Sequence, residues 1–183
     1  LSEDMPAVQV NDTGNLTVNY GVIKSDSTAV YWQSAGTFTM NNGLLLGGTG
    51  LEAGLGTVKL HGGYICGTGA SDAITSPEQG MPWIEGSALL CWAQAQPSQS
   101  KASLKIQIAD GHFISTSGYA LHIYQTGAHD LPSPATAIAV DYCVSMKSAP
   151  NKPLITMEKQ STDTINQVSI IFSRLLEGST MAA

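Results

Sequence analysis

The sequence has few charged residues. They make up 12% of the 183 residues, about half of the ~25% that is usual in globular proteins. Lys and Arg number 8 against 14 Asp and Glu, which gives a net charge of −6, and the single arginine is Arg174. A protein that neutralises nucleic-acid phosphates, or that is drawn to anionic lipid, needs a basic surface. The sequence therefore predicts no nucleic-acid partner.

Long hydrophobic runs are also absent. The longest apolar stretches, such as residues 87–93 and 168–172, are strand-sized and fall short of the ~20 residues that cross a bilayer. We therefore expect no membrane insertion. No signal peptide is visible, and the chain opens at Leu1, which favours a fragment or a trimmed product.

Cysteine is scarce, and the three cysteines have no paired spacing. Cys66, Cys91 and Cys143 are odd in number and form no CxxC pair, so they do not indicate a disulfide framework. Each lies in an apolar run, which predicts three buried thiols.

Residues that could carry catalysis are sparse as well. Cys66 lies between glycines, but His61 precedes it by only five residues, too close for the separate barrel of a chymotrypsin-like viral protease. His129 and Asp130 are adjacent but have no second pair at metal-ligand spacing. The glycines between residues 47 and 69 do not form a phosphate loop. We therefore expect no enzyme activity, no metal and no cofactor.

The dominant pattern is an alternation with a period of two. Residues 102–108, 119–124 and 137–146 show it, as do strands with one solvated face. Asn41-Asn42-Gly43 and Ala109-Asp110-Gly111 supply the positive φ that hairpin turns need. About ten strands at regular spacing predict an all-β, antiparallel β-sandwich of jelly-roll or Greek-key type.

Two segments fit this pattern less well. Residues 44–56 are rich in glycine and are expected to form a loop, whereas residues 162–176 are compatible with a helix but are rich in β-formers, which favours a strand. No long repeat and no linker divides the chain.

A strand-rich chain with few charges is typical of proteins that display a surface rather than catalyse. Binding loops on such folds lie between strands, and residues 44–56, 67–86 and 126–134 are the candidates. The receptor-binding candidates are four aromatic residues and one histidine, because exposed rings bind sugars and protein partners: Trp83, Tyr31, Tyr119, Tyr124 and His129.

The beginning of the chain resembles a known family. Residues 7–18 place Val8, Val10, Leu16 and Val18 around a polar turn with Gly14, and this pattern resembles the last repeat of a trimeric viral fibre shaft of the adenovirus type. The resemblance implies that residues 1–20 are the end of a shaft or leading strands and that residues 21–183 are a β-sandwich head. It further implies a homotrimer on the virion surface, outside the cell, which attaches to a host-cell receptor, either a glycan or a protein.

Other functions stay open. Residues 137–146, followed by Lys147 to Pro150, are similar to the final jelly-roll strand and hinge of small icosahedral virus coats, which implies a coat protein or its projecting domain. A secreted carbohydrate-binding β-sandwich is a third possibility. A hydrolase is the weakest.

Overall fold

The computed structural model describes residues 5–69, 86–92, 103–125, 136–159 and 168–172. Within these ranges the chain forms strands and no helices. The strands are β1 (Val8–Asp12), β2 (Leu16–Val18), β3 (Val22–Lys24), β4 (Thr28–Met40), β5 (Leu44–Gly47), β6 (Thr49–Leu60), β7 (Tyr64–Gly67), β8 (Leu89–Trp92), β9 (Leu104–Ser115), β10 (Leu121–Gln125), β11 (Thr136–Lys147), β12 (Ile155–Lys159) and β13 (Val168–Phe172).

Every described strand pair is parallel, so the predicted antiparallel sandwich is wrong. Val8 of β1 lies opposite Val30 of β4, and Leu44 of β5 lies opposite Tyr64 of β7. The partners are therefore 22 and 20 residues apart along the chain. Such pairing stacks successive turns of one chain on each other, which is the arrangement of a parallel β-solenoid.

The solenoid has three faces, each a parallel sheet. Face A contains β1, the first half of β4, the first half of β6, then β8, β10 and β12. Face B contains β2, the second halves of β4 and β6, the first halves of β9 and β11, and β13. Face C contains β3, β5, β7 and the second halves of β9 and β11.

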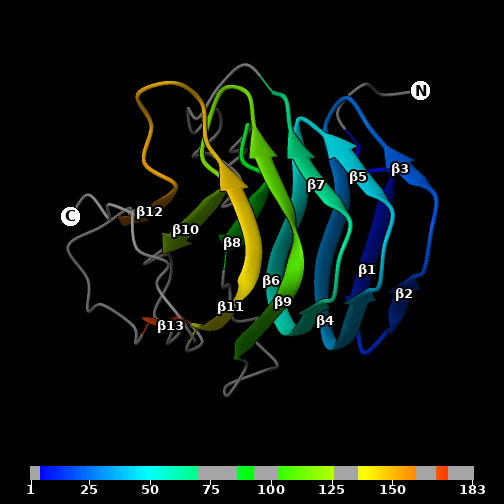
Figure 1. Cartoon of the computed structure of the whole chain (residues 1–183). Coiled ribbons are helices and arrows are strands. Elements are labelled where there is room, and N and C mark those ends of the chain that lie inside the picture. The colour runs from blue at the N-terminus through cyan, green and yellow to red at the C-terminus, as the bar shows by residue number, and fades with distance from the viewer. Residues whose placement is uncertain (1–4, 70–85, 93–102, 126–135, 160–167, 173–183) are drawn as a thin grey trace.

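The chain thus runs A, B, C in each of five coils, and a sixth coil supplies β12 and β13. Residues 8–12 and 16–18, predicted as a shaft end or leading strands, form the first coil together with β3. Figure 1 shows the strands of face C side by side, with β3 at one end of the solenoid and β12 at the other.

The period of two creates the core, as the sequence predicted. In β9, Leu104, Ile106 and Ile108 are buried while Lys105 and Gln107 between them are exposed. Equivalent residues of neighbouring coils stack inside the solenoid, and Trp32 packs against Phe38 with ring centroids 5.8 Å apart. The core is therefore a set of apolar columns that run along the axis.

Glycines form the corner between faces B and C. Gly43 and Gly111 have φ of 115° and 127°, as expected from the sequence, because residues with a Cβ rarely adopt these angles. The predicted hairpins, however, are wrong. Each glycine turns the chain from one face onto the next, so the following strand pairs with another coil and not with the strand that precedes the turn.

The glycine-rich segment 44–56 is not the predicted loop, since it forms β5 and most of β6. Its glycines lie where backbones approach closely. A Cβ on Gly47 would lie 2.3 Å from the carbonyl oxygen of Thr49, and one on Gly50 would lie 2.7 Å from that of Ala88. Of the segment 162–176, the described part is strand β13, as predicted; the rest lies outside the described residues.

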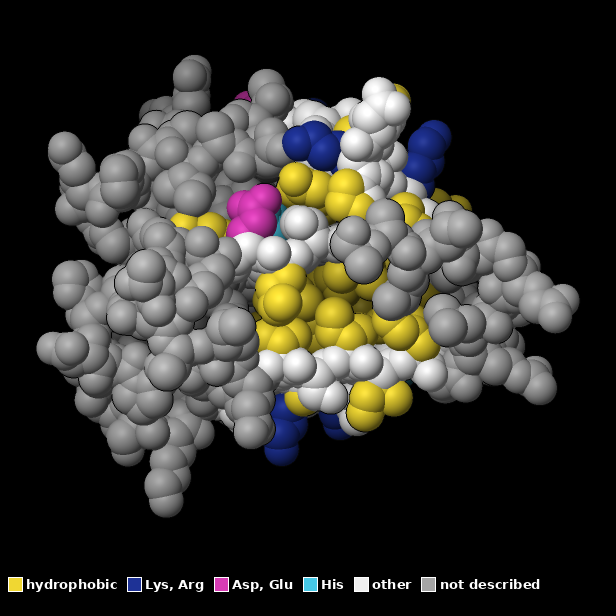
Figure 2. Space-filling model, turned by 90° about the vertical axis from the view of Figure 1, so that its left-hand side faces the viewer, with side chains coloured by type: hydrophobic (Ala, Val, Ile, Leu, Met, Phe, Trp, Pro, Cys, Tyr) yellow, Lys and Arg dark blue, Asp and Glu magenta, His cyan; other side chains and the backbone are white. Residues whose placement is uncertain are grey.

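The sixth coil ends the described solenoid with an apolar surface. Figure 2 looks onto this end and shows hydrophobic side chains gathered at its centre. Met157 of β12, which is in register with the buried Ile123 of β10, is 57% exposed at this end. None of the described residues belongs to a helix that could span a membrane.

The three cysteines differ in exposure, so the prediction of three buried thiols holds for one of them. Cys91 is buried, Cys66 is half-buried and Cys143 is exposed. Cys143 lies beside the B/C corner, where the register of β11 against β9 shifts after Val140 and turns the side chain outward.

Thiol labelling should follow this order. We expect a disulfide reagent at neutral pH to modify Cys143 first and Cys66 more slowly, because burial raises the pKa of the Cys66 thiol. Cys91 should react only after unfolding. The C143S variant should lose the fast phase alone, and a fast phase that survives in C143S would contradict the assignment.

Candidate functional site

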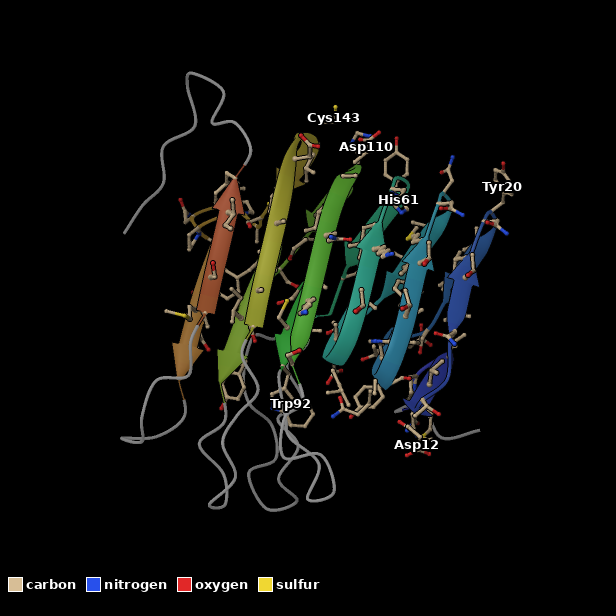
Figure 3. All side chains as sticks on the ribbon, turned by 90° about the horizontal axis from the view of Figure 1, so that it is seen from below. Asp12, Tyr20, His61, Trp92, Asp110 and Cys143 are labelled. Atoms are coloured by element: carbon tan, nitrogen blue, oxygen red, sulfur yellow. The ribbon has the colours of Figure 1, made fainter. Side chains whose placement is uncertain are left out.

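The outer side of face B is polar in the first four coils, as expected for a solvated sheet. Figure 3 looks onto this face, with Asp12 and Trp92 along one edge and Tyr20, His61, Asp110 and Cys143 along the other. One outward column begins with Thr17, Thr39, Lys59 and Gln107 and continues through Ala139 to Ile171, which is 64% exposed. The hydroxyl, lysine and amide side chains of the first four coils can be solvated by water alone, and the column becomes apolar only in the last two coils.

The outer side of face C has the opposite character, although its strands alternate in the same way. Two columns of side chains point outward from its five strands, and we call them together the face C stripe. The first column is Val22, Leu44, Tyr64, His112 and Ser145, and the second is Lys24, Leu46, Cys66, Ile114 and Lys147.

The glycine corner determines which residues point outward. In the first four coils the strand of face C begins directly after the glycine, as with Gly63 before Tyr64 and Gly111 before His112. The first residue points outward and the second, such as Ile65 or Phe113, enters the core. The sequence thus places an apolar residue on both sides of this sheet.

The stripe is accessible. Val22 is 66% and Tyr64 is 48% exposed, and His112 is exposed as well. Contiguous exposed apolar surface on a folded protein marks an interaction site more often than chance. Face C is therefore the strongest candidate for a binding surface among the described residues.

Two rings form the centre of the stripe. Tyr64 of β7 and His112 of β9 are directly opposite in register and stack with centroids 4.5 Å apart and planes 17° apart. Such ring pairs contribute about 0.5–1.5 kcal/mol. Each ring restricts the other, so the pair is a platform that is ordered before any ligand arrives.

The charges of the stripe all have one sign. Its ten described positions include two exposed lysines, Lys24 in the first coil and Lys147 in the fifth, and no carboxylate. The chain as a whole carries a net charge of −6. The distribution of charge on this face is therefore unlike that of the molecule.

A buried polar cluster lies on face A. The hydroxyl of Ser87 is 3.4 Å from Nδ1 of His122, and Nε2 of His122 is 3.3 Å from Oε2 of Glu158. The rings of Tyr119 and Tyr124 contact the imidazole edge-on. The cluster joins three successive coils, since Ser87 precedes β8, His122 is in β10 and Glu158 is in β12.

The order hydroxyl, imidazole, carboxylate is that of a nucleophile relay. Ser87 and His122 are nevertheless completely buried, and the carboxylate of Glu158 alone is partly exposed, at 39%. The cluster offers no exposed nucleophile, so its evident role is to connect coils. The expectation that the chain is not an enzyme stays a prediction.

Another carboxyl on face A, that of Glu52, is buried. Burial raises its pKa to about 7, and the hydroxyl of Thr28, which donates a hydrogen bond of 3.3 Å to Oε2, opposes the shift. Burial and then the charge of Glu52 raise the pKa of the Tyr31 hydroxyl. From these two shifts we expect the stability of the fold to depend on pH.

The five predicted receptor-binding residues do not form one surface. Tyr119 and Tyr124 are buried, and Tyr31 is half-buried, so little of the first two rings is available to a receptor. Trp83 and His129 lie outside the described residues. No group of three metal-ligating side chains occurs among the described residues.

The residues of the face C stripe were missed at the sequence level. Tyr64 and His112 each follow a glycine in the pattern apolar-x-apolar-x-x-Gly, which occurs at residues 16–21, 38–43, 58–63 and 106–111. This repeat, overlooked because its spacing varies, aligns the four residues after the glycines in one column.

Comparison of the chain with protein-family models, with curated proteins and with solved structures finds no match.

Proposed function

We propose that this chain is a binding module that attaches to carbohydrate through the face C stripe. The observation that supports the proposal is the exposed pair of stacked rings, Tyr64 and His112, which lies among apolar side chains on the outer side of face C. The rest of the solenoid is a rigid scaffold that fixes the strands beneath the rings.

The size of the stripe favours a chain-like ligand over a folded partner. Five strands at a spacing of ~4.8 Å, each contributing about four residues of ~3.3 Å, give a patch of roughly 300 Å². A stable protein–protein interface buries about 800 Å² per partner. The stripe by itself is too small for such an interface, whereas an oligosaccharide can cover it lengthwise.

The side chains of the face C stripe also favour an oligosaccharide as the ligand. Sugar rings present apolar C–H faces together with hydroxyl groups, and aromatic side chains bind such faces while their polar atoms bind hydroxyls. Tyr64 and His112 supply both, and Leu44 and Ile114 extend the apolar surface on either side.

Glycan-array screening followed by calorimetry tests the proposal. We expect the Y64A/H112A variant to bind the best array ligand at least about tenfold more weakly than the unmodified protein, because central aromatic residues contribute most to such interfaces. The matched control is I171A, which removes an exposed apolar side chain from face B. Equal losses in both variants, or no array ligand at all, would refute the proposal.

Attachment to a host-cell receptor from a virion surface, as a homotrimer, stays a prediction. The β-sandwich head that the fibre resemblance implied is not the fold of the described residues, so the proposal for the face C stripe does not depend on that resemblance. Sedimentation of the full chain measures the oligomeric state directly.

A further inference from the structure

We infer that the glycan bound by the face C stripe is acidic and that Lys24 and Lys147 bind its negative groups. This inference rests on the proposed function, because it names the class of ligand for the same stripe. It is carried by the placement of charge on face C.

Both lysines are aligned with the apolar column and lie at its two ends. Lys24 is opposite Leu46 in register, and the same column continues through Cys66 and Ile114 to Lys147. Four strand spacings of ~4.8 Å separate them, or about 19 Å. A ligand that follows the solenoid axis over Tyr64 therefore meets a cation at each end.

Neither lysine has a carboxylate partner within the stripe. The nearest residues in the column are Leu46 beside Lys24 and Ile114 beside Lys147, and both ammonium groups are exposed. The described carboxyl nearest to Lys24 along the chain is that of Asp26, two residues on and outside the stripe, and neither lysine takes part in an ion pair among the described residues. An exposed lysine that is not held in an ion pair is available to an anionic ligand.

The same charges argue against a second copy as the occupant. When two solenoids pair face to face about a two-fold axis with their long axes aligned, the first coil lies opposite either the first or the fifth coil of the other copy. Both arrangements bring lysine near lysine at the ends of the stripe. Like charges brought together at an interface disfavour the pairing.

Face B provides the control for non-specific attraction. Lys59 and Lys105 lie on neighbouring strands of that face, among threonine and glutamine side chains. They have the same charge as Lys24 and Lys147 but lie away from the rings. If an acidic glycan bound only through the overall charge of the protein, its affinity would fall equally when Lys59 and Lys105 or Lys24 and Lys147 are neutralised.

The experiment compares uronate-containing oligosaccharides with their carboxyl-reduced counterparts, which keep the sugar chain and lose the charge. We expect the unmodified protein to bind the acidic form about tenfold more tightly at low salt. The difference should shrink at physiological ionic strength, because exposed charges are screened. The K24Q/K147Q variant should lose the preference for the acidic form at low salt, whereas K59Q/K105Q should retain this preference.

The possible results separate the two proposals. Equal affinity for the acidic and the carboxyl-reduced oligosaccharide would overturn the inference, and so would a preference for the acidic form that is unchanged in K24Q/K147Q. In either case the proposal of carbohydrate binding stands if Y64A/H112A binds both oligosaccharides more weakly than the unmodified protein. A loss of preference in K59Q/K105Q equal to that in K24Q/K147Q also overturns it. Absence of binding to any form overturns both.

Discussion

Replacing Glu52 with glutamine is expected to stabilise the protein at pH 8 by about 3 kcal/mol and to leave its stability at pH 4 almost unchanged. The pKa of this carboxyl is about 7 in the folded chain and 4.5 in its unperturbed form. Each unit of difference corresponds to about 1.4 kcal/mol, which gives the expected magnitude.

The direction in which stability changes with pH follows from the number of protons that the folded and unfolded states bind. Between pH 4.5 and 7 the folded state keeps the proton of Glu52 while the unfolded state has lost it, so the folded state binds more protons and its stability falls as the pH rises. The penalty is absent below this window and complete above it. Glutamine is isosteric and uncharged, and its amide oxygen can still accept the hydrogen bond of Thr28, so E52Q removes the penalty alone.

Urea unfolding at several pH values between 4 and 9 measures the effect. D26N is the control, because Asp26 is an exposed carboxyl and its removal should shift the curve little. A pH profile of E52Q that runs parallel to that of the unmodified protein would show that Glu52 is not the source of the pH dependence.

The alternation in the sequence predicted which residues are buried, but it could not predict how the strands pair. Leu104, Ile106 and Ile108 alternate with polar residues, and that pattern is the same in a parallel and in an antiparallel sheet with one solvated face. The direction of the neighbouring strand depends on contacts between residues 20 to 48 positions apart, which local periodicity does not record.

Turn residues were informative about backbone angle and misleading about topology. Gly43 and Gly111 have the predicted positive φ, yet the same dipeptides that close hairpins also form the corners of a solenoid. The evidence that separates the two is the recurrence of the corner in successive coils, where Gly21, Gly43, Gly63 and Gly111 align. That recurrence has unequal spacing, so it was read as separate turns.

The binding candidates failed for a related reason. Tyr119 and Tyr124 were chosen because aromatic residues bind ligands, but residues 119–124 are buried on both sides of face A. A strand that alternates between aromatic and aliphatic residues does not reveal whether its second side is covered. Tyr64 and His112 lie side by side only because β7 and β9 pair in parallel. The antiparallel sandwich predicted from the sequence did not contain this pairing.

Replacing Gly56 with alanine is expected to lower the free energy of unfolding strongly, although it adds only one methyl group. Gly56 lies at the corner between faces A and B with a φ of 74°, and a Cβ there would lie 2.1 Å from the carbonyl oxygen of Ser34. Its amide also donates a hydrogen bond to the carbonyl of Ser103, which holds the third coil to the fourth. Gly56 thus lies between the second coil and the fourth, so a shift of its backbone away from Ser34 disturbs the contact with Ser103.

The matched control for G56A is G21A. Gly21 has a φ of 99°, but no atom lies within 4 Å of the position of its Cβ, so alanine there adds backbone strain alone, about 1 kcal/mol. G56A adds the clash, and we expect a loss of about 4 kcal/mol, or roughly 10 °C in melting temperature for a chain of this size. Thermal unfolding of both variants separates the two contributions. Equal, small shifts would mean that the A/B corner yields to the methyl group, and that the coils are held together by the apolar columns more than by the corner geometry.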